Sequence, residues 1–174
     1  NAPRAVYHPD RLSAQLLWFE SGEVEYRFSL GEIDPVQVEW LEISMELSSN
    51  APMYRENFKS DIYVGLGETE LGVWTSPGDY GARRGRFNPS WWSDTSSQYG
   101  LLKTWRVDNQ GCTLDGEPLS SVTLADLNLG GQDYLVLRIG VHADAAHVGG
   151  INLFGEQFGD FAQGIVVRVG YAKP

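Results

Sequence analysis

The sequence predicts an all-β domain, an antiparallel β-sandwich or jelly roll of about eight to ten strands with one long functional loop. Three observations predict this fold class. Apolar and polar residues alternate in short segments along the chain, clusters of Gly, Pro, Asn and Asp separate those segments, and helical periodicity is nearly absent. A parallel α/β sheet would require helices between its strands, so the pattern excludes that class.

The clearest alternation lies in the first third of the chain. Residues 16–29 are predicted to form two short strands of a half-buried hairpin around a turn at Ser21 and Gly22. Residues 36–48 are predicted to form the clearest strand, although the phase of its apolar residues slips between Trp40 and Leu41. A β-bulge at that point would keep both sets of apolar side chains on the core face.

Six further segments carry the strand signal. They are residues 61–66, 69–75, 101–107, 121–124, 134–141 and 165–171. The helical candidates are residues 9–16 and a turn near residues 124–127, where Thr123 is placed to cap. No linker divides the chain and apolar strands occur up to its last residues, so residues 1–174 are expected to form a single domain.

Composition and charge limit the classes of function. Hydrophobic residues make up 42% of the 174 residues and charged residues 21%, which is typical of a globular protein. The formal net charge of −10 opposes contact with a phosphate backbone, so direct nucleic-acid binding by this chain is not expected. Arg83, Arg84 and Arg86 form a basic cluster, but it is small and has no neighbouring lysine.

Cysteine use and hydropathy indicate a compartment. The single cysteine, Cys112, cannot form an internal disulfide, and we expect it to be a small buried hydrophobe on a strand. No apolar run approaches the roughly 18 residues that cross a bilayer, and the first residues contain no hydrophobic signal region. We therefore expect a cytoplasmic protein without a membrane partner. Because the chain opens without methionine, we also expect it to be a domain excised from a longer protein.

Residues 76–100 form a long strandless loop, and loops of this length in compact domains are commonly functional. The loop concentrates aromatic rings and planar polar side chains. This combination suits a polyol, whose C–H face stacks on a ring while Asp, Asn, Gln or Arg bind its hydroxyl groups. Alternatively, the tryptophans close the end of the sandwich and the arginines are solvated. In either case we expect one of Trp91 and Trp92 to point inward.

Other motifs favour binding over catalysis. The glycines of the loop match no phosphate-binding motif. His142, Asp144 and His147 resemble a metal site, but one further histidine and no cysteine pair are available, so structural or ligand-contacting roles are favoured. No carboxylate pair or nucleophile motif stands out. We therefore expect no catalytic residue, no bound metal and no cofactor.

Four stretches carry a resemblance to a known family: residues 74–79 (WTSPGD), residues 83–86 (RRGR), residues 88–92 (NPSWW) and residues 99–105. With them, nearly the whole chain resembles the C-terminal effector domain of bacterial ArsR-like winged-helix transcriptional regulators, in which a helix-turn-helix domain precedes a β-sandwich. The resemblance implies a sensor domain, with DNA bound only through an upstream domain outside this chain. A thiolate metal site has no counterpart here, because Cys112 stands alone.

The expected function is that of a regulatory domain which binds a small polar metabolite, best matched by a saccharide, and which forms a homodimer that the ligand rearranges. The expected binding residues are Trp74, Asp79, Arg83, Arg86, Trp91, Trp92, Tyr99, His142, His147 and Asn152. Two alternatives stay open. One is a structural dimerisation or interaction module of the same regulator. The other is an exported carbohydrate-active enzyme or its carbohydrate-binding module.

Overall fold

The computed structural model describes residues 13–31 and 33–172, and these residues form eleven strands. The strands are β1 (Leu16–Phe19), β2 (Gly22–Ser29), β3 (Val38–Ser48), β4 (Ser60–Leu66), β5 (Thr69–Ser76), β6 (Leu101–Asp108), β7 (Cys112–Leu114), β8 (Glu117–Ser120), β9 (Tyr134–Val141), β10 (Ile151–Phe154) and β11 (Val166–Tyr171). Short 3-10 helices lie between them at η3 (Pro35–Gln37), η4 (Leu124–Leu127) and η5 (Leu129–Gly131). No helix of the described residues is long and apolar enough to cross a membrane.

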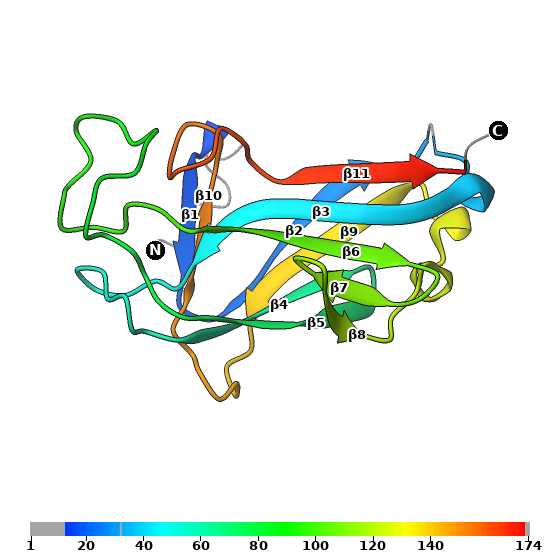
Figure 1. Ribbon diagram of the computed structural model, residues 1–174, viewed down its shortest axis with the longest axis horizontal. Helices are drawn as coiled ribbons and strands as arrows, with labels where there is room; N and C mark the ends of the chain where they lie inside the picture. Colours follow the sequence, from blue (N-terminus) through cyan, green and yellow to red (C-terminus); the bar gives the residue numbers. More distant parts are fainter. Residues whose placement is uncertain (1–12, 32, 173–174) are drawn as a thin grey trace.

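The strands form two antiparallel sheets that pack face to face, which confirms the predicted β-sandwich (Figure 1). One sheet has the order β1-β10-β3-β6-β7-β8, with β11 also paired to β3, and the other has the order β2-β9-β4-β5. The chain switches sheets at every step from β1 to β6 except in the β4–β5 hairpin, and again before and after β9. This interleaving of strands is that of a jelly roll, to which the β7–β8 hairpin and β11 are added.

The hydrophobic core lies between the two sheets. It is built by alternate residues of the facing strands, such as Ile43 and Met45 of β3 and Leu137 of β9, all of which are fully buried. Cys112 belongs to the same core on β7, as predicted from its isolation in the sequence. Burial raises the pKa of its thiol to about 11, so the group is an unreactive core side chain.

The irregularity of the longest strand lies nearer its start than the sequence predicts. Pairing of β3 with β6 is regular from Trp40 to Leu47, whereas pairing with β11 shifts where Gly170 faces Trp40 and Tyr171 faces Val38. Val38 is buried in the core, but Trp40 is only partly buried and lies outside it. The prediction of a bulge at Trp40 that turns this ring inward is therefore wrong. The Trp40 ring instead packs against Gly170. A Cβ atom at residue 170 would lie 2.0 Å from Cε2 of that ring, so only glycine leaves room for it.

Residues 16–29 form two strands, but the predicted hairpin is wrong. β1 pairs with β10 in one sheet, and β2 pairs with β9 in the other. The chain crosses between the sheets just before Gly22, whose φ of 106° suits glycine. The alternation of apolar and polar residues in this segment indicates which side chains are buried. It does not indicate the pairing partners, which are strands in the C-terminal half of the chain.

Some predictions of short strands and helical turns are confirmed, and others are wrong. The strand predicted at residues 121–124 is wrong, because β8 ends at Ser120 and η4 begins at Leu124. The predicted turn at residues 124–127 is confirmed, and Thr123 N donates to Asp126 Oδ2 (2.8 Å) at its start. Half of the helical candidate, residues 9–12, lies outside the described residues, and Leu16 already begins β1. The predicted segments omit β7, β8 and β10, which are each of at most 4 residues.

At one end of the sandwich, loops cover the outer face of the first sheet. Ser44, Glu46 and Ser48 alternate along β3 with core residues and so point away from the core, yet each is at most 6% exposed. The loop of residues 77–100 and the segment of residues 155–165 lie over them. Glu46 accepts hydrogen bonds from backbone N–H groups in both segments, and so fixes this third layer to the sheet.

Candidate functional site

The loop of residues 77–100 is anchored where other loops meet at the end of the sandwich. Figure 1 shows this green loop extending past the end at which β1 and β10 lie. Its first residues contact the β3–β4 connection, where Phe58 N donates to Pro77 O (3.1 Å) and Ser49 N donates to Gly78 O (3.1 Å). Glycine is required here, because a Cβ at Gly78 would lie 2.2 Å from the carbonyl oxygen of Glu56.

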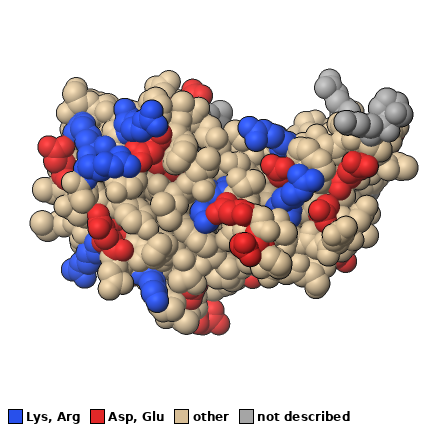
Figure 2. Space-filling view, viewed as in Figure 1, with Lys and Arg blue, Asp and Glu red and all other residues tan. Residues whose placement is uncertain are grey.

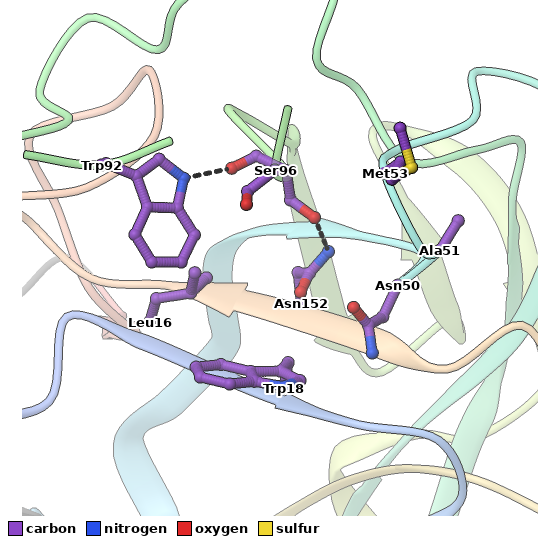
Figure 3. A pocket seen from close by; sticks show the side chains of 9 residues that line it. Leu16, Trp18, Asn50, Ala51, Met53, Trp92, Ser96 and Asn152 are labelled. Atoms are coloured by element: carbon purple, nitrogen blue, oxygen red, sulfur yellow. Dashed lines mark hydrogen bonds between the residues drawn. The ribbon is translucent and has the colours of Figure 1, made fainter. Parts of the chain in front are cut away.

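A cavity of about 200 Å³ lies between this loop, the β3–β4 connection, β1 and β10. Figure 3 shows its lining from close by. The lining residues are Leu16, Trp18, Asn50, Ala51, Met53, Trp92, Ser96, Ser97 and Asn152. Two of the predicted binding residues, Trp92 from the loop and Asn152 from β10, are thus brought together although they lie 60 positions apart in the sequence.

Indole rings border the cavity on two sides. Trp92 is partly buried, and its ring meets Phe158 edge to face with centroids 4.9 Å apart. Trp18 projects from the outer face of β1 and is 42% exposed. Trp91 is 75% exposed and meets Trp92 at 5.9 Å without lining the cavity. The prediction that one member of the Trp91–Trp92 pair points inward is confirmed, and that member is Trp92.

The floor of the cavity is a buried hydrogen-bond network. Asn152 Nδ2 donates to Ser49 O (2.6 Å), with Ser48 Oγ and Ser97 Oγ both 3.1 Å away. Because a carbonyl oxygen can only accept, the contact with Ser49 fixes which way the Asn152 amide points. Ser97 Oγ in turn donates to Asp79 Oδ2 (2.7 Å). The network therefore holds the floor in one arrangement before any ligand binds.

Asp79, a predicted binding residue, lies beneath this floor instead of in the cavity. Its side chain is fully buried, and Oδ2 accepts from Ala51 N (2.8 Å) as well as from Ser97 Oγ. Desolvation raises the pKa of the carboxyl group to about 6, and these hydrogen bonds offset part of that rise. No ion pair within residues 13–31 and 33–172 includes Asp79. An ionised Asp79 is therefore a negative charge without a cationic partner under the cavity.

Arg83 and Tyr99 line a separate cavity of about 380 Å³ at the start of β6. The Arg83 guanidinium lies 3.8 Å above the Tyr99 ring and contacts both carboxylate oxygens of Asp160, at 2.9 and 2.5 Å. Burial raises the pKa of Asp160, but hydrogen bonds from Arg83 and from Arg86 N lower it by more. The guanidinium of Arg86 lies 6.0 Å from the ring of Phe87. The hydrogen bonds of Arg83 and of Arg86 N with Asp160 join the long loop to residues 155–165.

Two of the three guanidinium groups in the arginine cluster are paired with carboxylates. Arg83 is paired with Asp160, and Arg84 Nη1 lies 2.6 Å from Asp94 Oδ1. Figure 2 shows basic and acidic side chains next to one another over this face, without a large patch of one sign. Paired guanidinium groups release few counterions from a phosphate backbone, so the cluster is poorly suited to nucleic acid.

The remaining predicted residues line neither cavity. Trp74 on β5 packs against the core. His142 stacks on Tyr63 with ring centroids 4.1 Å apart, and His147 Nδ1 lies 3.2 Å from both carboxylate oxygens of Asp61. Both histidines therefore contact β4 of the second sheet. No group of three or more His, Cys, Asp and Glu in the described part of the chain is arranged to hold a metal ion.

The sequence interpretation missed most of the cavity wall. Trp18, the pair Asn50 and Met53, and Ser97 lie in three different stretches, and no spacing rule relates these stretches. One signal was present: Trp18 alternates with the core-packed Leu17 and Phe19, so its large ring had to lie on the outer face of β1.

The cavity and its buried polar floor are thus the features on which a functional conclusion depends. The two indole rings and the fixed amide are contributed by separate segments that only the fold brings together. In comparisons with known proteins, no protein-family model matches the sequence, and no curated protein is significantly similar to it.

Proposed function

We propose that this chain is a binding domain for a small polar ligand with an apolar face, best matched by a saccharide, and that the ligand occupies the cavity between Trp18 and Trp92. The observation that carries the proposal is the combination of two partly exposed indole rings with a preorganised floor of Asn152 and Ser97. A sugar ring presents C–H groups that stack on an indole and hydroxyl groups that such a floor can bind.

The size of the cavity supports a ligand of about one sugar ring. Its volume of about 200 Å³ lies below the roughly 300–1,000 Å³ of pockets for drug-sized molecules. Asp and Glu are not among its lining residues, whereas glycoside hydrolysis uses two carboxyl groups on either side of the scissile bond. This lining favours binding over catalysis.

The biological setting is also part of the proposal. The resemblance to ArsR-like effector domains supports a bacterial, cytoplasmic transcriptional regulator, in which an upstream domain binds DNA. Binding in the cavity would then change the equilibrium between two arrangements of a homodimer, which requires the ligand to bind one arrangement more tightly than the other. An exported carbohydrate-binding module would use the same cavity in another setting, and the full open reading frame distinguishes the two.

Replacement Trp92→Ala is expected to weaken saccharide binding at least tenfold, because it removes a stacking surface of the cavity. Isothermal titration calorimetry with neutral mono- and oligosaccharides measures the loss. Trp91→Ala is the matched control, since Trp91 is the adjacent tryptophan, is 75% exposed and does not line the cavity. Absence of binding by the folded wild-type chain across the panel would overturn the saccharide proposal.

A second candidate function, dimerisation through the loop, is favoured by the exposure of Trp91. The loop carries two exposed aromatic side chains, Trp91 at 75% and Phe87 at 39%, and exposed apolar side chains of this kind are typical of an interface. If this surface joins two copies of the chain, Trp91→Ala shifts the sedimentation profile from dimer to monomer, whereas Trp92→Ala leaves it unchanged. Identical sedimentation of wild type and Trp91→Ala would exclude Trp91 as a dimer contact.

A further inference from the structure

The hydrogen-bond donors of the inner cavity are already used within the protein. Asn152 Nδ2 has two hydrogens and three acceptors, in Ser49, Ser48 and Ser97. The single hydroxyl hydrogen of Ser97 is donated to Asp79 when that carboxyl group is ionised. The hydrogen-bond donors of the buried floor side chains are therefore all engaged within the network.

Donors in the cavity wall are used in the same way. Trp92 Nε1 donates its hydrogen to Ser97 O (2.9 Å). The backbone N–H of Ala51 donates to Asp79 Oδ2 (2.8 Å), and that of Asn50 donates to Gly149 O (2.9 Å). The side-chain donors that remain among the lining residues belong to residues that are at least partly exposed, such as the indole of Trp18.

The groups of the floor that remain free to bind a ligand are hydrogen-bond acceptors. Asn152 retains its amide oxygen Oδ1, and Ser97 Oγ retains one lone pair after donating one bond and accepting one. The ionised carboxylate of Asp79 lies one hydrogen bond below Ser97 and has no cationic partner in the described chain. The floor therefore offers acceptors and a negative potential to whatever enters.

We infer that the cavity selects its ligand by charge: it takes a molecule that donates hydrogen bonds to Asn152 and Ser97, prefers a protonated amine over a hydroxyl at that position, and rejects anions. An amino sugar would fit best, and a neutral sugar less well. A carboxylate has no hydrogen to donate at neutral pH, a phosphate monoester is mostly dianionic there, and either group would be repelled by the negative charge of Asp79. This inference rests on the proposed saccharide site and adds the class of saccharide.

The test compares four probes of similar size on the wild-type chain at pH 7: glucose, glucosamine, glucuronate and glucose 6-phosphate. Calorimetry is expected to show glucosamine binding about tenfold more tightly than glucose, and both anions binding at least tenfold more weakly than glucose. If an anion binds as tightly as glucose, charge selection is refuted while the saccharide site stands. If none of the four binds, the saccharide proposal itself fails.

Variants test whether Asp79 is the positioning residue responsible for this charge selection. Asp79→Asn removes the charge, and we expect the preference for glucosamine over glucose to fall from about tenfold to about twofold. Asp94→Asn is the matched control: it removes the same charge from the same loop, but its side chain is 85% exposed and paired with Arg84. An unchanged preference in Asp79→Asn would overturn the role of Asp79. Should that variant not fold, Ser97→Ala tests the same path, because it deletes the acceptor above Asp79 and is expected to weaken glucosamine binding more than glucose binding.

Discussion

Replacement Glu46→Ala is expected to lower the free energy of unfolding by about 3 kcal/mol or more, since it leaves several buried backbone donors unpaired at about 1–3 kcal/mol each. The Glu46 carboxylate is fully buried and accepts from Gly100 N (2.7 Å), Asp160 N (3.0 Å) and Phe161 N (3.0 Å). Burial raises the pKa of this group, and the three hydrogen bonds partly oppose the rise. The loss would be a large fraction of the stability of a domain.

Urea unfolding, followed by circular dichroism, measures this change from the midpoint at constant slope. The matched control is Glu42→Ala, which lies on the same face of β3 but pairs with Arg106 at a partly exposed position (2.8 Å). That ion pair is expected to contribute less than about 1 kcal/mol. Equal small losses in the two variants would contradict the view that Glu46 fixes the long loop and residues 155–165 to the sheet.

Asp79→Asn is expected to change how stability depends on pH. The pKa of the Asp79 carboxyl is about 6 in the folded chain against an ordinary value of 3.8, so the folded state holds its proton more tightly than the unfolded state. This stabilisation is complete below about pH 4 and is lost as the pH rises through about 6. At about 1.4 kcal/mol per pKa unit, the loss is on the order of 2 to 3 kcal/mol. The asparagine side chain does not titrate, so the variant lacks this pH-dependent contribution to the free energy of unfolding.

The measurement is the difference in unfolding free energy between Asp79→Asn and wild type, taken at intervals from pH 4 to pH 7. We expect the variant to gain stability relative to wild type by about 2 to 3 kcal/mol across this range. Contributions from other groups, Glu46 and Asp160 among them, cancel in the difference because both proteins carry them. Asp94→Asn, whose carboxylate is 85% exposed, should show no comparable trend. A flat difference for Asp79→Asn would show that the buried carboxylate does not titrate near pH 6.

The sequence by itself determined the fold class and the general location of the candidate site. Alternation in segments such as residues 36–48 and 134–141 identified strands, because burying one face of a sheet imposes a period of two on the side chains. The length and aromatic content of residues 76–100 identified the loop that now covers the cavity. The sequence also predicted that one of Trp91 and Trp92 points inward, and the structure shows that this residue is Trp92.

Only the tertiary structure decided which strands pair and which polar residues are buried. Alternation separates the faces of a strand but does not say whether a loop later covers the outer face, so Glu46 gave no sign of its burial in the sequence. Asn152 lies in the lining of the cavity because β10 pairs with β1 and β3, strands more than 100 residues earlier in the chain. Such contacts depend on the closure of two sheets around one core, which no local pattern encodes.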